Sequence, residues 1–179
     1  MIIIVWFCIA ASEMLLAAFL YGRCGEEWFD IIRILVLNGW LFFTAYMDLK
    51  NYRITNRWIL CGLCAGGVFW IAELIAQKNG GPKMLDCILG ACLGSGILLG
   101  GSMIRKGGIG MGDVKLFFIL GLFCGTERVF FLLLLTLVFA LLVGAVRMML
   151  GKMGRKDRLP LGPFAYAAWI LTILSENPG

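Results

Sequence analysis

The sequence predicts an all-α polytopic membrane protein, folded as a bundle of about seven transmembrane helices. Of its 179 residues, 61% are hydrophobic and 15% are charged, and the mean hydropathy is +0.92. Soluble domains are about 45–50% apolar and about 25% charged, so this composition is typical of an integral membrane protein. The apolar residues also fall into runs near the roughly 20 residues that a helix needs to cross a bilayer.

Polar segments divide these runs and give the expected spans in order. No basic residue precedes the first run, 2–20, so we expect a first span there and not a cleaved signal peptide. The run 114–150 is too long for one span, and the charged pair Glu127-Arg128 in its interior predicts a tight turn between a short fifth span and a sixth. The fourth run is rich in glycine, which suits close packing between helices. The other apolar runs cover 28–47, 58–76, 84–103 and 160–174.

The basic residues predict how the bundle is oriented. With seven spans, eleven of the sixteen Lys and Arg residues lie on one face and five on the other. Basic residues are enriched in cytoplasmic loops, so we expect the first face to be cytoplasmic in a multi-pass protein of the cell membrane. The net charge of +5 is thereby explained by topology, and no nucleic-acid partner is expected. The eleven residues are Lys50, Arg53, Arg57, Arg105, Lys106, Lys115, Arg147, Lys152, Arg155, Lys156 and Arg158.

The residue types present exclude several catalytic classes. The chain has no histidine, which excludes Ser-His-Asp and Cys-His nucleophile arrangements and HExxH zinc sites. Most of the seven cysteines lie in apolar runs, and Cys61 and Cys64 form a lone C-x-x-C, so we interpret them as small packing residues. We therefore expect neither a metal nor a cofactor.

Two aspartates stand at matching places beside apolar runs. Asp113 follows Gly110 and Gly112 and precedes the run that begins at residue 114, while Asp48 follows the run 28–47. The glycines are expected to allow backbone conformations that other residues resist. An aspartate entering lipid is costly, so each acid should face protein or water and have a function. Two spans separate them, which puts both on the predicted cytoplasmic face.

Each acid alone has an ordinary structural explanation, but together they suit acid–base catalysis. Asp48 could pair with Lys50 or Arg53, and Asp113 could cap the fifth span. Two carboxylates brought close cannot both ionise easily, so one keeps its proton while the other acts as a base. The base takes a proton from water, the water attacks a carbonyl, and the acid protonates the oxygen or the leaving amine. The sequence therefore predicts an Asp48/Asp113 dyad that hydrolyses peptide bonds.

The residues around Asp113 resemble a known family motif. The segment Gly110-x-Gly112-Asp113-x-Lys115-Leu116 is similar to the GxGDxKL motif of type IV prepilin peptidases, which are GxGD membrane aspartyl proteases. This motif alone is a weak signal, but two further segments resemble the same family in the expected order.

One of these segments follows the first acid, and the other lies near the C-terminus. Asp48 with Ile54-Thr55-Asn56 is similar to the family's first aspartate and its downstream Ile-Pro-Asn, with Thr55 in place of the proline. The other segment is similar to the family's Pro-x-Gly-Pro-Phe and consists of Pro160, Leu161, Gly162, Pro163 and Phe164. The resemblance covers a core of about 28–174, within one expected membrane-embedded domain, 1–179.

The resemblance implies a membrane aspartyl endopeptidase that cleaves the leader from type IV pilin-like precursors at the cytoplasmic face. Its partners would be the precursor and the lipid bilayer. Larger members carry a cytosolic domain linked to N-methylation, so this chain looks like the short form and we expect it to cleave without methyl transfer. The sequence leaves the oligomeric state open.

Two alternatives remain open at this point. A presenilin-type intramembrane protease also has a GxGD motif, but its first acid directly follows a tyrosine, whereas Asp48 follows Tyr46-Met47. A transporter or membrane assembly factor without catalysis would suit acids in the middle of a span, whereas these acids stand at span ends. A cleavage assay on the purified protein separates these classes.

Overall fold

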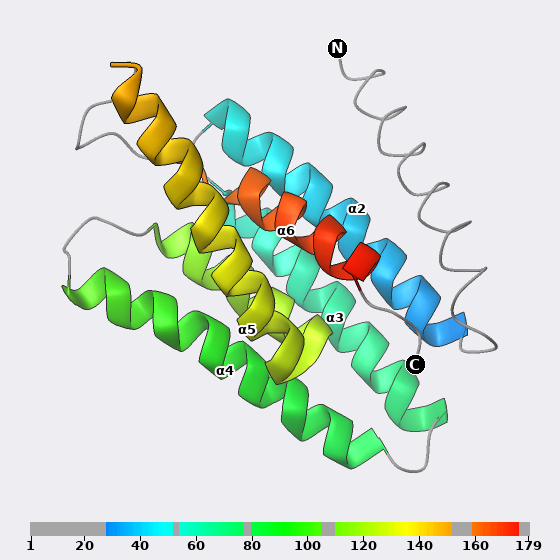
Figure 1. The fold of residues 1–179 in the computed structure, drawn as a ribbon. Helices are drawn as coiled ribbons and strands as arrows, with labels where there is room; N and C mark the ends of the chain where they lie inside the picture. The colour runs from blue at the N-terminus through cyan, green and yellow to red at the C-terminus, as the bar shows by residue number, and fades with distance from the viewer. Residues whose placement is uncertain (1–27, 52–53, 77–79, 105–109, 152–158, 176–179) are drawn as a thin grey trace, which may run out of the picture.

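The computed structural model describes residues 28–51, 54–76, 80–104, 110–151 and 159–175. These residues form a bundle of helices that run roughly side by side, and the described ranges contain no β-strand (Figure 1). The helices are α2 (Trp28–Asn51), α3 (Asn56–Ala76), α4 (Gly80–Ile104), α5 (Met111–Met149) and α6 (Gly162–Ser175).

The described residues form five helical elements and not seven, and six of the seven predicted spans fall in this part of the chain. The first predicted span, 2–20, lies outside the described residues. The predicted fifth and sixth spans correspond to two helical arms of α5, which are joined at Gly125, a residue with non-helical φ and ψ. Three segments are long and apolar enough to cross a membrane: Ile31–Asn51, Met84–Ile104 and Met111–Met149.

Helix α5 reverses its direction at Gly125. The backbone there has φ 80° and ψ −178°, a conformation that is essentially restricted to glycine. Gly94 of α4 shows how sharp the reversal is, because a Cβ placed on it would lie 3.2 Å from the carbonyl oxygen of Phe117 and 3.1 Å from Val129. In a straight helix those two residues would stand about 18 Å apart at ~1.5 Å per residue. The chain therefore runs to Gly125 in a first arm and returns in a second (Figure 1).

Asp86 of α4 holds the turn between the two arms. The Thr126 amide donates to both carboxylate oxygens of Asp86 at 3.4 Å, and the Thr126 hydroxyl donates to the Asp86 carbonyl at 2.8 Å. The Asp86 carboxylate thus accepts a hydrogen bond at the start of the second arm, as an N-cap side chain does. The sequence predicted a turn at Glu127-Arg128, and the reversal lies at the glycine just before that pair.

Small residues bring α4 and α5 close together. A Cβ placed on Gly121 would overlap the backbone of Gly90 and Ala91, so a larger residue there would push the two helices apart. This confirms the packing role that the glycine-rich fourth run predicts. Other glycines of α4, Gly96 and Gly100, have no neighbour within 4 Å of such a Cβ.

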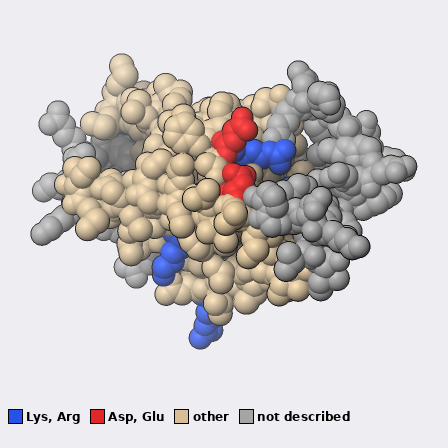
Figure 2. All heavy atoms as spheres, turned by 90° about the horizontal axis from the view of Figure 1, so that it is seen from below, with Lys and Arg blue, Asp and Glu red and all other residues tan. Residues whose placement is uncertain are grey.

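The core joins α2, α5 and α6, and the outer faces remain apolar. Leu41, Ile119, Leu132 and Ala168 are at most 1% exposed. The outer faces of α3, α4 and the second arm of α5 expose large apolar side chains, and the view from below shows a surface with few charged groups (Figure 2). An apolar exterior around a packed core is what a bilayer requires. The protein is a membrane protein.

Candidate active site

Asp48 lies in the last turn of α2 with its carboxylate enclosed by protein. Its side chain is 5% exposed, and its Oδ2 accepts a hydrogen bond from the Gly162 amide at 2.8 Å. The interaction described for Asp48 is thus with the backbone of α6; Lys50 is exposed, and Arg53, the other predicted partner, lies outside the described residues. A negative charge at a helix N-terminus is favourable because the first amides of a helix have no partner within it.

Gly162 allows α6 to begin directly against Asp48. A Cβ placed on Gly162 would lie 3.0 Å from both Cβ and Oδ2 of Asp48 and 3.2 Å from the Cα of Ala45. Pro160 is buried just before the helix, and Pro163 occupies its first turn, where a fixed φ and a missing N–H cost nothing. The three residues of the C-terminal motif thus set where the N-terminus of α6 meets Asp48.

Asp113 lies in the first turn of α5 and is partly exposed. Its amide donates to the Gly110 carbonyl at 3.0 Å, and its carboxyl group also interacts with the backbone of Gly110, the N-cap residue of α5. Gly110 has φ −73° and ψ 139°, which any residue adopts, so the expected unusual backbone is absent there. What Gly110 provides is room, because a Cβ on it would lie 3.0 Å from Asp113 Oδ2.

The fold brings Asp48 and Asp113 to the same end of the bundle. Lys115, two residues after Asp113, donates to Asn56, and Gly112 lies against Ile54, so the start of α5 meets the segment that follows Asp48. Both acids therefore stand at helix ends, one enclosed and hydrogen-bonded to backbone, the other partly open. Such a pair can divide the roles of acid and base, since like charges at short range do not both ionise easily.

Lys115 and Asn56 connect the helices on the other side of Asp113. The Lys115 Nζ donates to the Asn56 Oδ1 at 2.9 Å, which joins the first turn of α5 to the first residue of α3. Both side chains are exposed. A Cβ on Gly112 would lie 3.4 Å from Ile54, an ordinary contact, so α5 also packs against the residues just before α3.

Sequence reasoning missed a buried network beneath Asp48. The Thr44 hydroxyl donates to the Trp40 carbonyl at 2.7 Å and accepts from Trp58 Nε1 at 3.0 Å, and Trp40 Nε1 donates to the Trp58 carbonyl at 3.1 Å. Phe43 adds a ring contact to Trp58 with centroids 4.3 Å apart. The network ties α2 to the start of α3, one turn before Asp48. The i, i+4, i+8 spacing of Trp40, Thr44 and Asp48 was the available signal.

The side chains that could bind a metal ion form no metal centre within the described ranges. No three His, Cys, Asp or Glu side chains come together there as a metal site would need. Cys61 and Cys64 are exposed on α3.

Comparison with known proteins gives one family and one curated relative. A model of the type IV leader peptidase family matches residues 35–145, which include Asp48, Asn56, Asp113 and Lys115. The chain is 27% identical over 175 residues to the prepilin leader peptidase/N-methyltransferase of Bacillus subtilis (strain 168), covering 94% of this chain and 66% of that protein. The chain thus spans slightly less than two thirds of that relative. No solved structure matches. The family match extends over more than half of the chain, and this protein belongs to the type IV leader peptidase family.

Proposed function

We propose that this protein is an aspartyl endopeptidase that removes the leader from type IV pilin-like precursors, with Asp48 and Asp113 as its catalytic dyad. One observation carries the proposal: the two acids, far apart in the sequence, lie at one end of the bundle, where α2 ends with Asp48 in its last turn, α5 begins with Asp113 in its first turn, and Lys115 of α5 is hydrogen-bonded to Asn56 at the start of α3. The family and the printed name of the relative support a leader-bearing pilin precursor as substrate.

The mechanism uses the difference between the two environments. A water molecule held between the carboxylates gives a proton to the ionised one, and its oxygen attacks the carbonyl carbon of the scissile peptide bond. The protonated carboxyl donates its proton to the carbonyl oxygen. When the C–N bond breaks, the leaving amine takes up a proton, and the dyad returns to its singly protonated state. The Gly162 amide restrains Asp48 during these transfers.

The position of the acids favours a peptidase over a transporter. Asp48 is in the last turn of α2 and Asp113 in the first turn of α5, so both stand where helices end. An ion path would be better served by acids in the middle of a span. At the end of the bundle the acids can meet a peptide bond that lies at the membrane surface.

We place this end of the bundle at the cytoplasmic face, because eleven of the sixteen basic residues are assigned to it. Single cysteines in a cysteine-free background test this. Positions 55 and 155 should react with a membrane-impermeant reagent from the cytoplasm, and position 80 from outside. Labelling of 55 and 155 from opposite sides would contradict the orientation.

The dyad is tested by removing each acid without changing its shape. Asp48→Asn and Asp113→Asn should each abolish cleavage of a purified precursor, because an amide can neither activate water nor shuttle a proton. The double variant should be no worse than either single one, since the pair acts as a unit. Glu127→Gln is the matched control: it makes the same acid-to-amide change at an exposed residue near the α5 turn and should cleave normally. Near-normal turnover by either single variant would refute the dyad.

The same reaction can include labelled S-adenosylmethionine. Methyl transfer needs a pocket for the cofactor, and the longest polar segments of this chain are about ten residues, too short to build one. We expect the leader to be released and the new amino terminus to stay unlabelled. A labelled amino terminus would show that the chain has a methyl-transfer site.

A further inference from the structure

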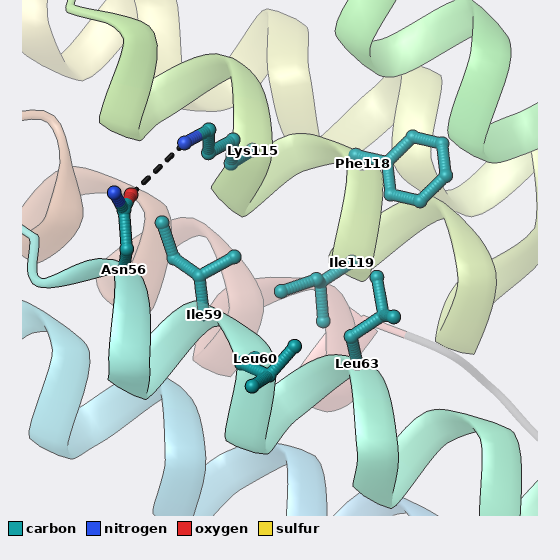
Figure 3. Close-up of a pocket in the computed structure, with 7 residues that line it drawn as sticks. All are labelled: Asn56, Ile59, Leu60, Leu63, Lys115, Phe118 and Ile119. Atoms are coloured by element: carbon teal, nitrogen blue, oxygen red, sulfur yellow. Dashed lines mark hydrogen bonds between the residues drawn. The ribbon is translucent and has the colours of Figure 1, made fainter.

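An open groove of about 310 Å³ runs between α3 and the first arm of α5. Its walls are five apolar side chains, Ile59, Leu60, Leu63, Phe118 and Ile119. The hydrogen-bonded pair of Lys115 and Asn56 lies at one end of it (Figure 3). The groove is therefore apolar along its length and cationic at its mouth.

The groove faces away from the catalytic acids. At about 100° per residue, Lys115 stands roughly 200° around α5 from Asp113. Leu116, Phe117 and Leu120, on the side of Asp113, are at most 1% exposed and belong to the core, whereas Lys115 is exposed. The body of α5 separates the groove from the dyad, so a second ligand can occupy it without blocking the site of cleavage.

The direction of the groove matches the depth profile of a bilayer. Asn56 is the first residue of α3, and Lys115 lies in the first turn of α5, so the polar mouth is at the helix ends. From Asn56 to Leu63 the wall runs about 10 Å along the helix at ~1.5 Å per residue, toward the middle of the membrane. The mouth thus lies near the headgroups and the apolar part within the hydrocarbon.

The size of the groove favours a single hydrocarbon chain over an α-helix as its occupant. A helix with its side chains is about 10–12 Å wide and occupies roughly 800 Å³ along the same 10 Å of wall, so most of it would lie outside this open groove. The groove has about 310 Å³. A polymethylene chain approaches its neighbours at about 3.5–4.0 Å and fits a space of that width.

We propose that this groove binds one acidic phospholipid, with an acyl chain along the apolar walls and the phosphate at Lys115. The Lys115 ammonium supplies the charge, and the Asn56 amide, whose Oδ1 already accepts from Lys115, keeps its Nδ2 as a second donor. The bound lipid bridges the start of α3 to the arm that carries Asp113.

Native mass spectrometry of the purified full-length protein tests the proposal independently of cleavage. The protein, in a neutral detergent, is titrated with phosphatidylglycerol or phosphatidylcholine that have the same acyl chains. The first bound lipid should favour phosphatidylglycerol about fivefold, the ratio expected for one cation near an acidic headgroup. Lys115→Met should bring that ratio close to one, while Lys50→Met, which removes another cation at the end of α2, should keep it.

A second pair of variants tests the apolar walls. Leu60→Trp fills the groove and should lower the occupancy of both lipids, whereas Ile71→Trp, an equally exposed position on α3 outside the groove, should not. Equal binding of the two lipids by the unaltered protein, or full occupancy in Leu60→Trp, would overturn the proposal. So would displacement of the lipid by inorganic phosphate at the same concentration, because Lys115 would then bind phosphate without the groove. If Leu60→Trp leaves lipid binding intact but raises KM for the precursor, the groove binds substrate instead.

Discussion

Replacing Gly162 by alanine should test how closely catalysis depends on the contact between α2 and α6. The added methyl group would lie 3.0 Å from Asp48 Cβ and Oδ2 and 3.2 Å from the Ala45 Cα. Carbon atoms pack at about 3.5–4.0 Å, so the overlap is about 0.5–1 Å, and one of the atoms met is backbone. Helix α6 must therefore move away from α2, and the 2.8 Å hydrogen bond from the Gly162 amide to Asp48 must lengthen.

The magnitude follows from that hydrogen bond. A hydrogen bond to a charged group contributes about 1.5–3 kcal/mol, so its loss corresponds to about a 10- to 100-fold change if it orients Asp48 for reaction. We expect Gly162→Ala to reduce kcat for precursor cleavage by that factor and to lower the unfolding temperature.

The matched control is Gly100→Ala on α4, where the added methyl group meets nothing within 4 Å. It should leave turnover unchanged and be neutral or slightly stabilising, since alanine is the better helix former by roughly 1 kcal/mol. If Gly162→Ala turns over as fast as Gly100→Ala, the contact between Gly162 and Asp48 does not orient the acid.

Two further substitutions test the turn of α5 and the buried network. Gly125→Ala should destabilise the fold by about 2–5 kcal/mol, because it combines backbone strain at positive φ with an overlap against Asp86. Its control in a thermal unfolding assay is Gly96→Ala, where the added methyl group meets no neighbour. Equal unfolding temperatures for the two variants would contradict the observed reversal. Trp58→Phe keeps one aromatic ring but removes the pyrrole part of the indole with its donor to the buried Thr44 hydroxyl, and should cost at least about 1 kcal/mol in denaturant unfolding; no measurable loss would mean that this hydrogen bond contributes nothing to stability.

The sequence was most informative about its acidic residues, because a charged side chain is costly to place in a membrane. The sequence predicts that Asp48 and Asp113 lie on one face, because two spans separate them, and the structure has both at one end of the bundle. The structure adds what neither acid reveals alone: Asp48 is held by the Gly162 amide, so the C-terminal motif belongs to the same site. The sequence also placed Gly110 beside Asp113; of the two roles a glycine can have there, the structure supports room for a close neighbour and not an unusual backbone conformation.

The reversal of α5 and the groove beside Lys115 depend on packing between helices, which the pattern of apolar residues does not predict. Hydropathy cannot distinguish a loop between two spans from a reversal at one residue, because both leave a continuous apolar run. The reversal needs Gly125, the room left by Gly90 and the hydrogen bonds from Thr126 to Asp86. Of these residues, Gly90 and Asp86 belong to a different helix, α4. The groove beside Lys115 was likewise hidden, since its walls come from residues that are all ordinary span residues in the sequence.

The reversal at Gly125 also bears on the thickness of the membrane around the protein. The first arm of α5 from Met111 to Cys124 is about 21 Å long at ~1.5 Å per residue, and the hydrocarbon of a typical bilayer is about 30 Å thick. With Met111 at one surface, the exposed acids Asp86 and Glu127 beside the turn would stand about 9 Å inside the hydrocarbon. Hydrophobic mismatch of this kind costs a fraction of a kcal/mol per Å, and a bilayer relieves it by thinning.

Thinning on the α4/α5 side would bring water and headgroups to these acids while the long helix α2 keeps the membrane at full thickness. We therefore expect a higher unfolding temperature in bilayers of 14-carbon than of 18-carbon acyl chains. Equal stability in the two would mean that the acids reach water without deforming the membrane.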